Sequence, residues 1–163
     1  MTFNWPRCIV MLALATAIWS EAGAQRRSGS RSQASAAVPR LGAHLGYNFD
    51  GDVALLGAQA TFPLARQFDL YPSFDFYFTD GYTMWGLNLD VRYRLRRAPS
   101  LYFGAGLNYT RVSDDGFSGS STNLNFLGGI QGRRGGVVPF GEMRIIVGDA
   151  STFQLVGGLS WRI

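Results

Sequence analysis

Apolar and polar residues alternate along most of the chain, from Leu41 to the C-terminus. In the first such segment apolar side chains occupy every second position from Leu41 to Phe49, with glycine or polar residues between them. A period of two is typical of β-strands whose two faces meet different surroundings. The expected strands cover residues 41–50, 54–64, 68–78, 85–95, 103–110, 123–131, 137–148 and 153–163.

Segments of about ten residues have the length that tilted strands need to cross a bilayer. A sheet can cross only as a closed barrel, because hydrocarbon offers no partner for an edge strand. An even number of strands returns both chain ends to one side, and eight strands enclose an interior that side chains can fill. We therefore predict an all-β fold over residues 41–163, an eight-stranded antiparallel up-and-down transmembrane β-barrel.

Two prolines fall inside predicted strands, Pro72 in the third and Pro139 in the seventh. Proline has no backbone N–H to donate to a neighbouring strand. Since a barrel has no edge strand to hold them, we expect a local bulge or an irregular strand end at these positions.

The polar face consists mostly of Gly, Asn, Ser and Tyr, and the chain contains no lysine. Such a face suits a crowded lumen better than a water-exposed surface, so we expect the apolar face to meet lipid. Aromatic residues on the apolar face gather near strand ends, as in the girdles at membrane interfaces. One predicted girdle holds Tyr47, Phe49, Phe76, Phe78, Trp85, Tyr109 and Phe153, and the other Phe62, Phe68, Tyr93, Phe103 and Trp161.

Charged residues of both signs fall on the face assigned to the lumen. They are Asp69, Asp75, Asp90, Arg92, Arg94, Glu142, Arg144 and Arg162. Buried charges are tolerated only when they are paired and hydrogen-bonded. We expect these residues to form a network that plugs the barrel, with a narrow ion path as the alternative.

Hydrophobic residues make up 47% of the chain and charged residues 16%, which excludes a disordered protein. The mean hydropathy of +0.02 reflects the absence of the roughly 20-residue apolar run of a membrane helix. All 15 basic residues are arginine and the net charge is +4. The arginines form no stripe interleaved with aromatic residues, so we expect no nucleic acid partner.

The N-terminal segment predicts export. Arg7 is followed by an apolar stretch over residues 8–19 and by Ala22-Gly23-Ala24, a pattern that a signal peptidase accepts. Residues 1–24 are therefore predicted to be a cleaved signal peptide. Residues 25–40 are rich in Ser, Arg, Ala and Gln, which is typical of a flexible linker.

The chain resembles the small outer-membrane β-barrel family, which includes the barrel domain of outer-membrane protein A and opacity-protein-like relatives. The segments that carry the resemblance are Leu41–Tyr47, Tyr102–Tyr109 and the closing strand through Leu159, Trp161 and Ile163. The resemblance implies a location in the bacterial outer membrane, insertion by the barrel-assembly machinery, and contact with membrane lipid and lipopolysaccharide. Family members serve as structural anchors, adhesins or small channels, and a few are enzymes. The oligomeric state is not predicted.

Catalysis is not expected. His44 is the only histidine, no His-x-Ser pair occurs, and no metal-ligand cluster or cofactor motif is present. We expect His44 to lie in the lumen beside an acid, toward the end of the barrel where the chain begins.

Charges also divide between the two sets of turns. Acidic residues fall in the turns opposite the termini (Asp50, Asp52, Asp80, Asp114, Asp115 and Asp149), and arginines in the turns beside the termini (Arg66, Arg96, Arg97, Arg133 and Arg134). The outer loops are short, and the longest is expected at residues 113–121.

These features predict a structural role or a weak surface interaction through loops 50–52, 79–83, 113–121 and Asp149. The alternatives are a small ion-conducting channel, a soluble exported barrel that binds an apolar ligand and, last, a lipid-modifying enzyme.

Overall fold

The structure is a computed structural model that describes residues 38–114, 116–133, 135–148 and 151–163. The predicted signal peptide at 1–24 and the linker up to residue 37 lie outside the described residues, as do Asp115, Arg134 and Asp149. Arg40, expected to end the linker, instead begins the first strand.

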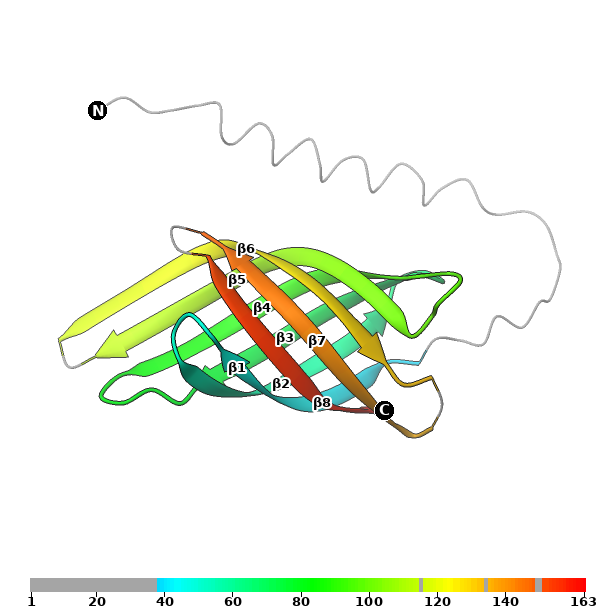
Figure 1. Ribbon diagram of the computed structural model, residues 1–163, viewed down its shortest axis with the longest axis horizontal. Coiled ribbons are helices and arrows are strands. Elements are labelled where there is room, and N and C mark those ends of the chain that lie inside the picture. Colours follow the sequence, from blue (N-terminus) through cyan, green and yellow to red (C-terminus); the bar gives the residue numbers. More distant parts are fainter. Residues whose placement is uncertain (1–37, 115, 134, 149–150) are drawn as a thin grey trace, which may run out of the picture. The chain divides into compact units, whose positions relative to one another are not determined.

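Eight strands form a closed antiparallel barrel (Figure 1). The strands are β1 Arg40–Asn48, β2 Val53–Pro63, β3 Phe68–Tyr77, β4 Thr83–Arg94, β5 Leu101–Asp114, β6 Phe117–Gln131, β7 Val137–Val147 and β8 Thr152–Arg162. Each strand pairs with its neighbours in sequence, and β1 pairs with β8 to close the ring. The predicted up-and-down topology is confirmed. Among the described residues, no helix is long and apolar enough to cross a membrane.

The closing register places the two ends of the barrel. Arg40 pairs with Arg162 and Asn48 pairs with Gln154, so β1 begins where β8 ends. We call this the terminal end, and the opposite one the distal end. The β2–β3, β4–β5 and β6–β7 connections lie at the terminal end, and the β1–β2, β3–β4, β5–β6 and β7–β8 connections at the distal end.

The two faces of the wall have the predicted polarity. Leu45 on the outer face is 64% exposed, whereas Asp75 and Arg144 on the inner face are 0% exposed. A water-soluble barrel would bury its apolar residues and expose its charged ones. The apolar outer face therefore suits lipid as its surroundings.

Aromatic rings form contacts near both ends of the outer face. At the terminal end Phe68, Tyr93 and Phe103 form a row across β3, β4 and β5, with ring centroids 5.2 Å apart at each contact. At the distal end Phe49 and Phe153 lie 5.4 Å apart. These positions match the two predicted girdles, which mark membrane interfaces in transmembrane barrels.

The two prolines are accommodated differently. Tyr71 and Pro72 have no partners in β2, and the register is the same on both sides of this gap. The bulge considered for Pro72 is therefore wrong, because the ladder is interrupted without an extra residue. Pro139 lies just past the end of the β6–β7 ladder, where Gly132 N–H donates to its carbonyl oxygen at 2.8 Å. On its other side Pro139 pairs with Leu159 of β8 in unbroken register, so the expected bulge or irregular strand end is absent there.

The predicted long loop at 113–121 is wrong. β5 continues to Asp114 and β6 begins at Phe117, so these residues form the tip of an extended hairpin (Figure 1). Pairing of β6 with β7 starts only at Leu124, so one edge of residues 117–123 has no strand partner among the described residues. This stretch is rich in Ser, Gly and Thr and lacks apolar alternation. Backbone hydrogen bonding between strands needs no such alternation. The hydrophobic pattern therefore did not predict that residues 117–122 belong to a strand.

Candidate functional site

The lumen is the candidate functional site, and the alternation of the strands supplies its side chains. On β3 every second residue from Asp69 to Tyr77 points inward and is buried. β4 contributes Asn88, Asp90 and Arg92 in the same way, and β7 contributes Glu142 and Arg144. Neighbouring strands thus bring polar side chains to the same depth in a narrow bore.

Asp75 is the centre of the network. Its Oδ2 accepts hydrogen bonds from Asn88 Nδ2 at 2.8 Å and from Arg144 Nη1 at 3.0 Å. Its Oδ1 lies 2.6 Å from His44 Nε2. The other ring nitrogen of His44 lies 2.5 Å from Gln59 Oε1. His44 is therefore the predicted lumen histidine beside an acid, but it lies midway along β1 rather than toward the terminal end.

Arg144 connects two carboxylates. Besides its bond to Asp75, its Nε donates to Glu142 Oε1 at 2.5 Å, and Tyr102 O–H donates to Glu142 Oε2 at 2.9 Å. β3 and β7 are four strands apart in the ring of eight, so they form opposite walls. The Arg144–Asp75 bond therefore crosses the bore, and both side chains are 0% exposed.

A second group of charges lies nearer the terminal end. Arg94 Nε is 2.9 Å from Asp69 Oδ2, and Arg92 Nη2 is 4.0 Å from the same oxygen. Arg92 Nη2 also donates to Thr61 Oγ1 at 3.0 Å. The Arg92 guanidinium carbon lies 3.7 Å from the centre of the Tyr71 ring, a cation–π contact.

Six of the eight predicted lumen charges lie in these two groups, and the remaining two do not. Asp90 is buried but receives its hydrogen bonds from Asn125 Nδ2, at 3.0 and 3.1 Å. Arg162 is exposed at the terminal end and forms no ion pair with the described residues. It is the last residue of β8, where the wall no longer encloses the inward face.

Neutral residues complete the lumen network. The sequence analysis did not predict them, because it selected charged residues only. They are Tyr71, Tyr102, Asn88, Asn125, Asn108 and Gln154, all buried. The sequence could have identified them by position, because each occupies one of the alternate positions whose side chains point into the lumen. Asn108 Nδ2, for example, donates to Asn88 Oδ1 at 2.7 Å and extends the chain of hydrogen bonds toward the distal end.

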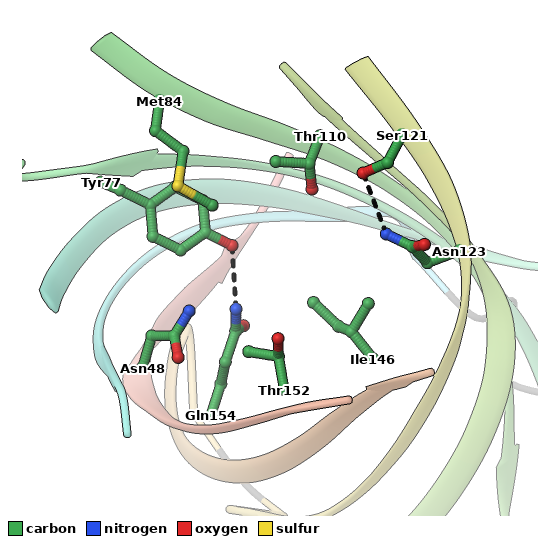
Figure 2. A pocket seen from close by; sticks show the side chains of 9 residues that line it. All are labelled: Asn48, Tyr77, Met84, Thr110, Ser121, Asn123, Ile146, Thr152 and Gln154. Atoms are coloured by element: carbon green, nitrogen blue, oxygen red, sulfur yellow. Dashed lines mark hydrogen bonds between the residues drawn. The ribbon is translucent and has the colours of Figure 1, made fainter. Parts of the chain in front are cut away.

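A cavity of about 270 Å³ occupies the distal mouth of the lumen (Figure 2). Its lining consists of Asn48, Tyr77, Met84, Thr110, Ser121, Asn123, Ile146, Thr152 and Gln154. Figure 2 shows two hydrogen-bonded pairs on its wall, Gln154 Nε2 donating to Tyr77 O–H at 2.9 Å and Asn123 Nδ2 donating to Ser121 Oγ at 3.2 Å. Sequence reasoning did not identify this cavity.

Most of the described charged turn residues lie where the pattern predicts, whereas Asp114, also expected in a turn, is the last residue of β5. Asp50, Asp52 and Asp80 follow strands at the distal end, and Arg66, Arg96, Arg97 and Arg133 lie at the terminal end. Asp50 and Asp52 take part in local structure: Asp50 Oδ2 accepts from Phe153 N–H at 2.5 Å, and Asp52 accepts from the Tyr47 hydroxyl. Across the described ranges, no group of three or more His, Cys, Asp and Glu residues is placed to hold a metal ion.

The closed wall, its apolar outer face and its polar interior define a small transmembrane β-barrel. Solved structures share this fold. The N-terminal β-barrel domain of Pseudomonas aeruginosa OprF matches with a TM-score of 0.65 and 16% identity, over 77% of this chain and 96% of that domain. Neisserial surface protein A matches with a TM-score of 0.56 and 15% identity, over 77% and 96%.

A designed transmembrane β-barrel is also similar, with a TM-score of 0.54 and 12% identity over 77% of this chain and 95% of the other. No protein-family model and no curated protein matches the sequence. At these identities the likeness concerns the fold alone, and it is the fold expected from the resemblance to small outer-membrane barrels.

Proposed function

We propose that this protein is a plugged barrel of the bacterial outer membrane, with a structural role or a role in surface interaction. The observation that carries the proposal is the bond from Arg144 to Asp75 across the bore, between side chains that are 0% exposed. With Glu142 and Tyr102 it forms a connected set of hydrogen bonds in the middle of the lumen, in which Arg144 Nη2 has no partner among the described residues. The apolar outer face and the aromatic girdles support a membrane location.

In this proposal the terminal end faces the periplasm. The signal peptide predicted at residues 1–24 exports the chain, the barrel-assembly machinery inserts it, and lipid and lipopolysaccharide surround it. The distal turns and the hairpin tip at 113–121 then form the outer surface. The edge of residues 117–123 that has no strand partner in the described part of the chain supports a role in surface interaction, because such backbone groups can pair with another chain.

The lumen supports a role other than catalysis. Both ring nitrogens of His44 are occupied, by Gln59 and Asp75, and the side chain is 0% exposed. A histidine in this position has no access to a substrate. A carrier for an apolar ligand lacks support as well, because the buried interior is lined mainly by charged residues, amides and tyrosines.

Ion conductance of the mature chain, residues 25–163, in planar bilayers tests the plug. We expect the wild-type protein to show no steady conductance, and a D75A/R144A variant to conduct because both side chains that meet across the bore are shortened. The matched control is R162A, which removes an arginine that is exposed at the rim. Steady wild-type conductance would favour the small channel and contradict the plug.

A further inference from the structure

We infer that the distal cavity is a binding site for a neutral, hydroxyl-bearing ligand, such as a single sugar unit. Nothing in the proposed plug requires this cavity. It lies directly outside the central network, since Tyr77 and Asp75 are successive inward residues of β3, and Ile146 and Arg144 are successive inward residues of β7. The plug therefore closes the inner end of a pocket whose mouth is distal.

The strongest sign of a ligand is an incomplete pair of hydrogen-bonding groups. Gln154 Nε2 donates to the Tyr77 hydroxyl oxygen at 2.9 Å, which leaves the hydroxyl hydrogen of Tyr77 available. Gln154 Oε1 is one of eight buried side-chain atoms without a hydrogen-bond partner among the described residues, and the only one of the eight whose residue lines this cavity. A free donor and a free acceptor thus lie side by side. One ligand hydroxyl, which both accepts and donates, satisfies the two.

Other lining groups present polar atoms in fixed orientations. Asn48 Oδ1 accepts from the backbone N–H groups of Asp50 and Gly51, each at 3.1 Å, and its Nδ2 donates to no described residue. Thr110 and Thr152 add hydroxyl groups to the wall. Because amides and hydroxyls offer both donors and acceptors, the lining suits a ligand with several hydroxyl groups.

Charge and size narrow the class of ligand. None of the nine lining residues is charged, and moving an ion out of water without a counter-charge is costly. Met84 and Ile146 supply apolar contact, which suits the C–H face of a sugar ring. A volume of about 270 Å³ lies just below the roughly 300 Å³ at which pockets for drug-sized ligands begin. The cavity therefore suits one sugar unit rather than a chain.

The test is a titration of the mature chain in lipid nanodiscs, where both ends of the barrel are in contact with solution. The readout is the ¹⁵N NMR signal of the side-chain amides of Gln154 and Asn48. The probes are two neutral sugars, methyl glucoside and N-acetylglucosamine, and two charged ones, glucuronate and glucosamine. We expect saturable shifts with a neutral sugar in the millimolar range, and binding of the charged sugars that is about tenfold weaker or absent.

The Q154L variant removes the buried acceptor, and we expect it to weaken binding about tenfold, followed through the Asn48 signal. The matched control is S160A, an inward position on the same strand at the terminal end, which should bind like the wild-type protein. Retained mobility of unboiled samples in gels checks that both variants fold.

Absent shifts with both neutral sugars, equal binding of charged sugars, or unweakened binding by folded Q154L would each overturn the proposal. Since both ends are exposed in nanodiscs, the result does not depend on the orientation proposed above. A conducting barrel that still binds sugar would refute the plug and keep the site.

Discussion

Arg144 illustrates how a single side chain organises the lumen. It contacts Asp75 at 3.0 Å and Glu142 at 2.5 Å, and all three side chains are 0% exposed. Removing one partner from a buried ion pair is strongly destabilising, because the remaining charge stays buried without compensation. In this network one arginine compensates two carboxylates. Its loss removes the guanidinium from both, and leaves Asp75 with Asn88 and His44 and Glu142 with the Tyr102 hydroxyl.

We expect R144M to lower the free energy of unfolding by about 3–5 kcal/mol, measured by urea unfolding in lipid vesicles. The comparison variant is R94M. The Arg94 side chain is 27% exposed and its buried partner Asp69 keeps Arg92 at 4.0 Å, so we expect a smaller loss than in R144M. Adding D75N and E142Q to R144M should recover part of the stability. Equal losses in R144M and R94M would contradict this account of the network.

Among the elements, the β5–β6 hairpin differs most from its neighbours. Residues 117–123 of β6 pair with β5 on one side and have no partner in β7 on the other. In an antiparallel strand successive amides point to opposite sides, so only every second amide of this stretch faces β5. The other amides face the unpaired edge.

Hydrogen exchange followed by NMR in nanodiscs should therefore show an alternating pattern over residues 117–123, with every second amide exchanging rapidly. The control stretch is 124–130 of the same strand, which is paired on both sides and should be protected uniformly. Uniform protection over 117–123 would contradict an open edge and would mean that it is covered, by another chain or by residues outside the described ranges.

The closed ring depends on close approach between β1 and β8. A Cβ atom added at Gly158 would lie 2.3 Å from the backbone oxygen of Ala43 and 2.8 Å from Cα of His44. Backbone atoms cannot move aside as a flexible side chain can, so a larger residue here forces the two strands apart. The neighbouring Gly157 has ample space, since the nearest atom to an added Cβ is the Phe140 oxygen at 3.8 Å.

We expect G158A to weaken closure by about 1–3 kcal/mol or more, and G157A to be tolerated. The measurement is the gel mobility of boiled and unboiled samples folded in detergent. Wild type and G157A should show a heat-dependent shift, and the unboiled band of G158A should be reduced or lost. A full shift in G158A would show that the β1–β8 contact tolerates a wider spacing.

The alternation of apolar and polar residues is a local property of the chain. Most of the architecture can therefore be predicted from the amino-acid sequence. The eight strands, the polarity of the two faces, the ends at which acidic and basic turns lie, and the inward direction of Asp75 and Arg144 all follow from a period of two. The Ser-, Gly- and Thr-rich hairpin was missed because backbone pairing leaves no periodic mark on side chains, and Pro72 left a gap rather than a bulge.

Contacts across the bore depend instead on strand number and register, which set the depth at which each inward side chain meets the opposite wall. That closure joined Arg144 to Asp75, gave Asp90 an asparagine partner and left Arg162 exposed at the rim. It also placed Gln154 beside Tyr77 at the distal mouth, 77 residues away along the chain. Such distant pairs share no local pattern, so they arise only when the sheet closes on itself.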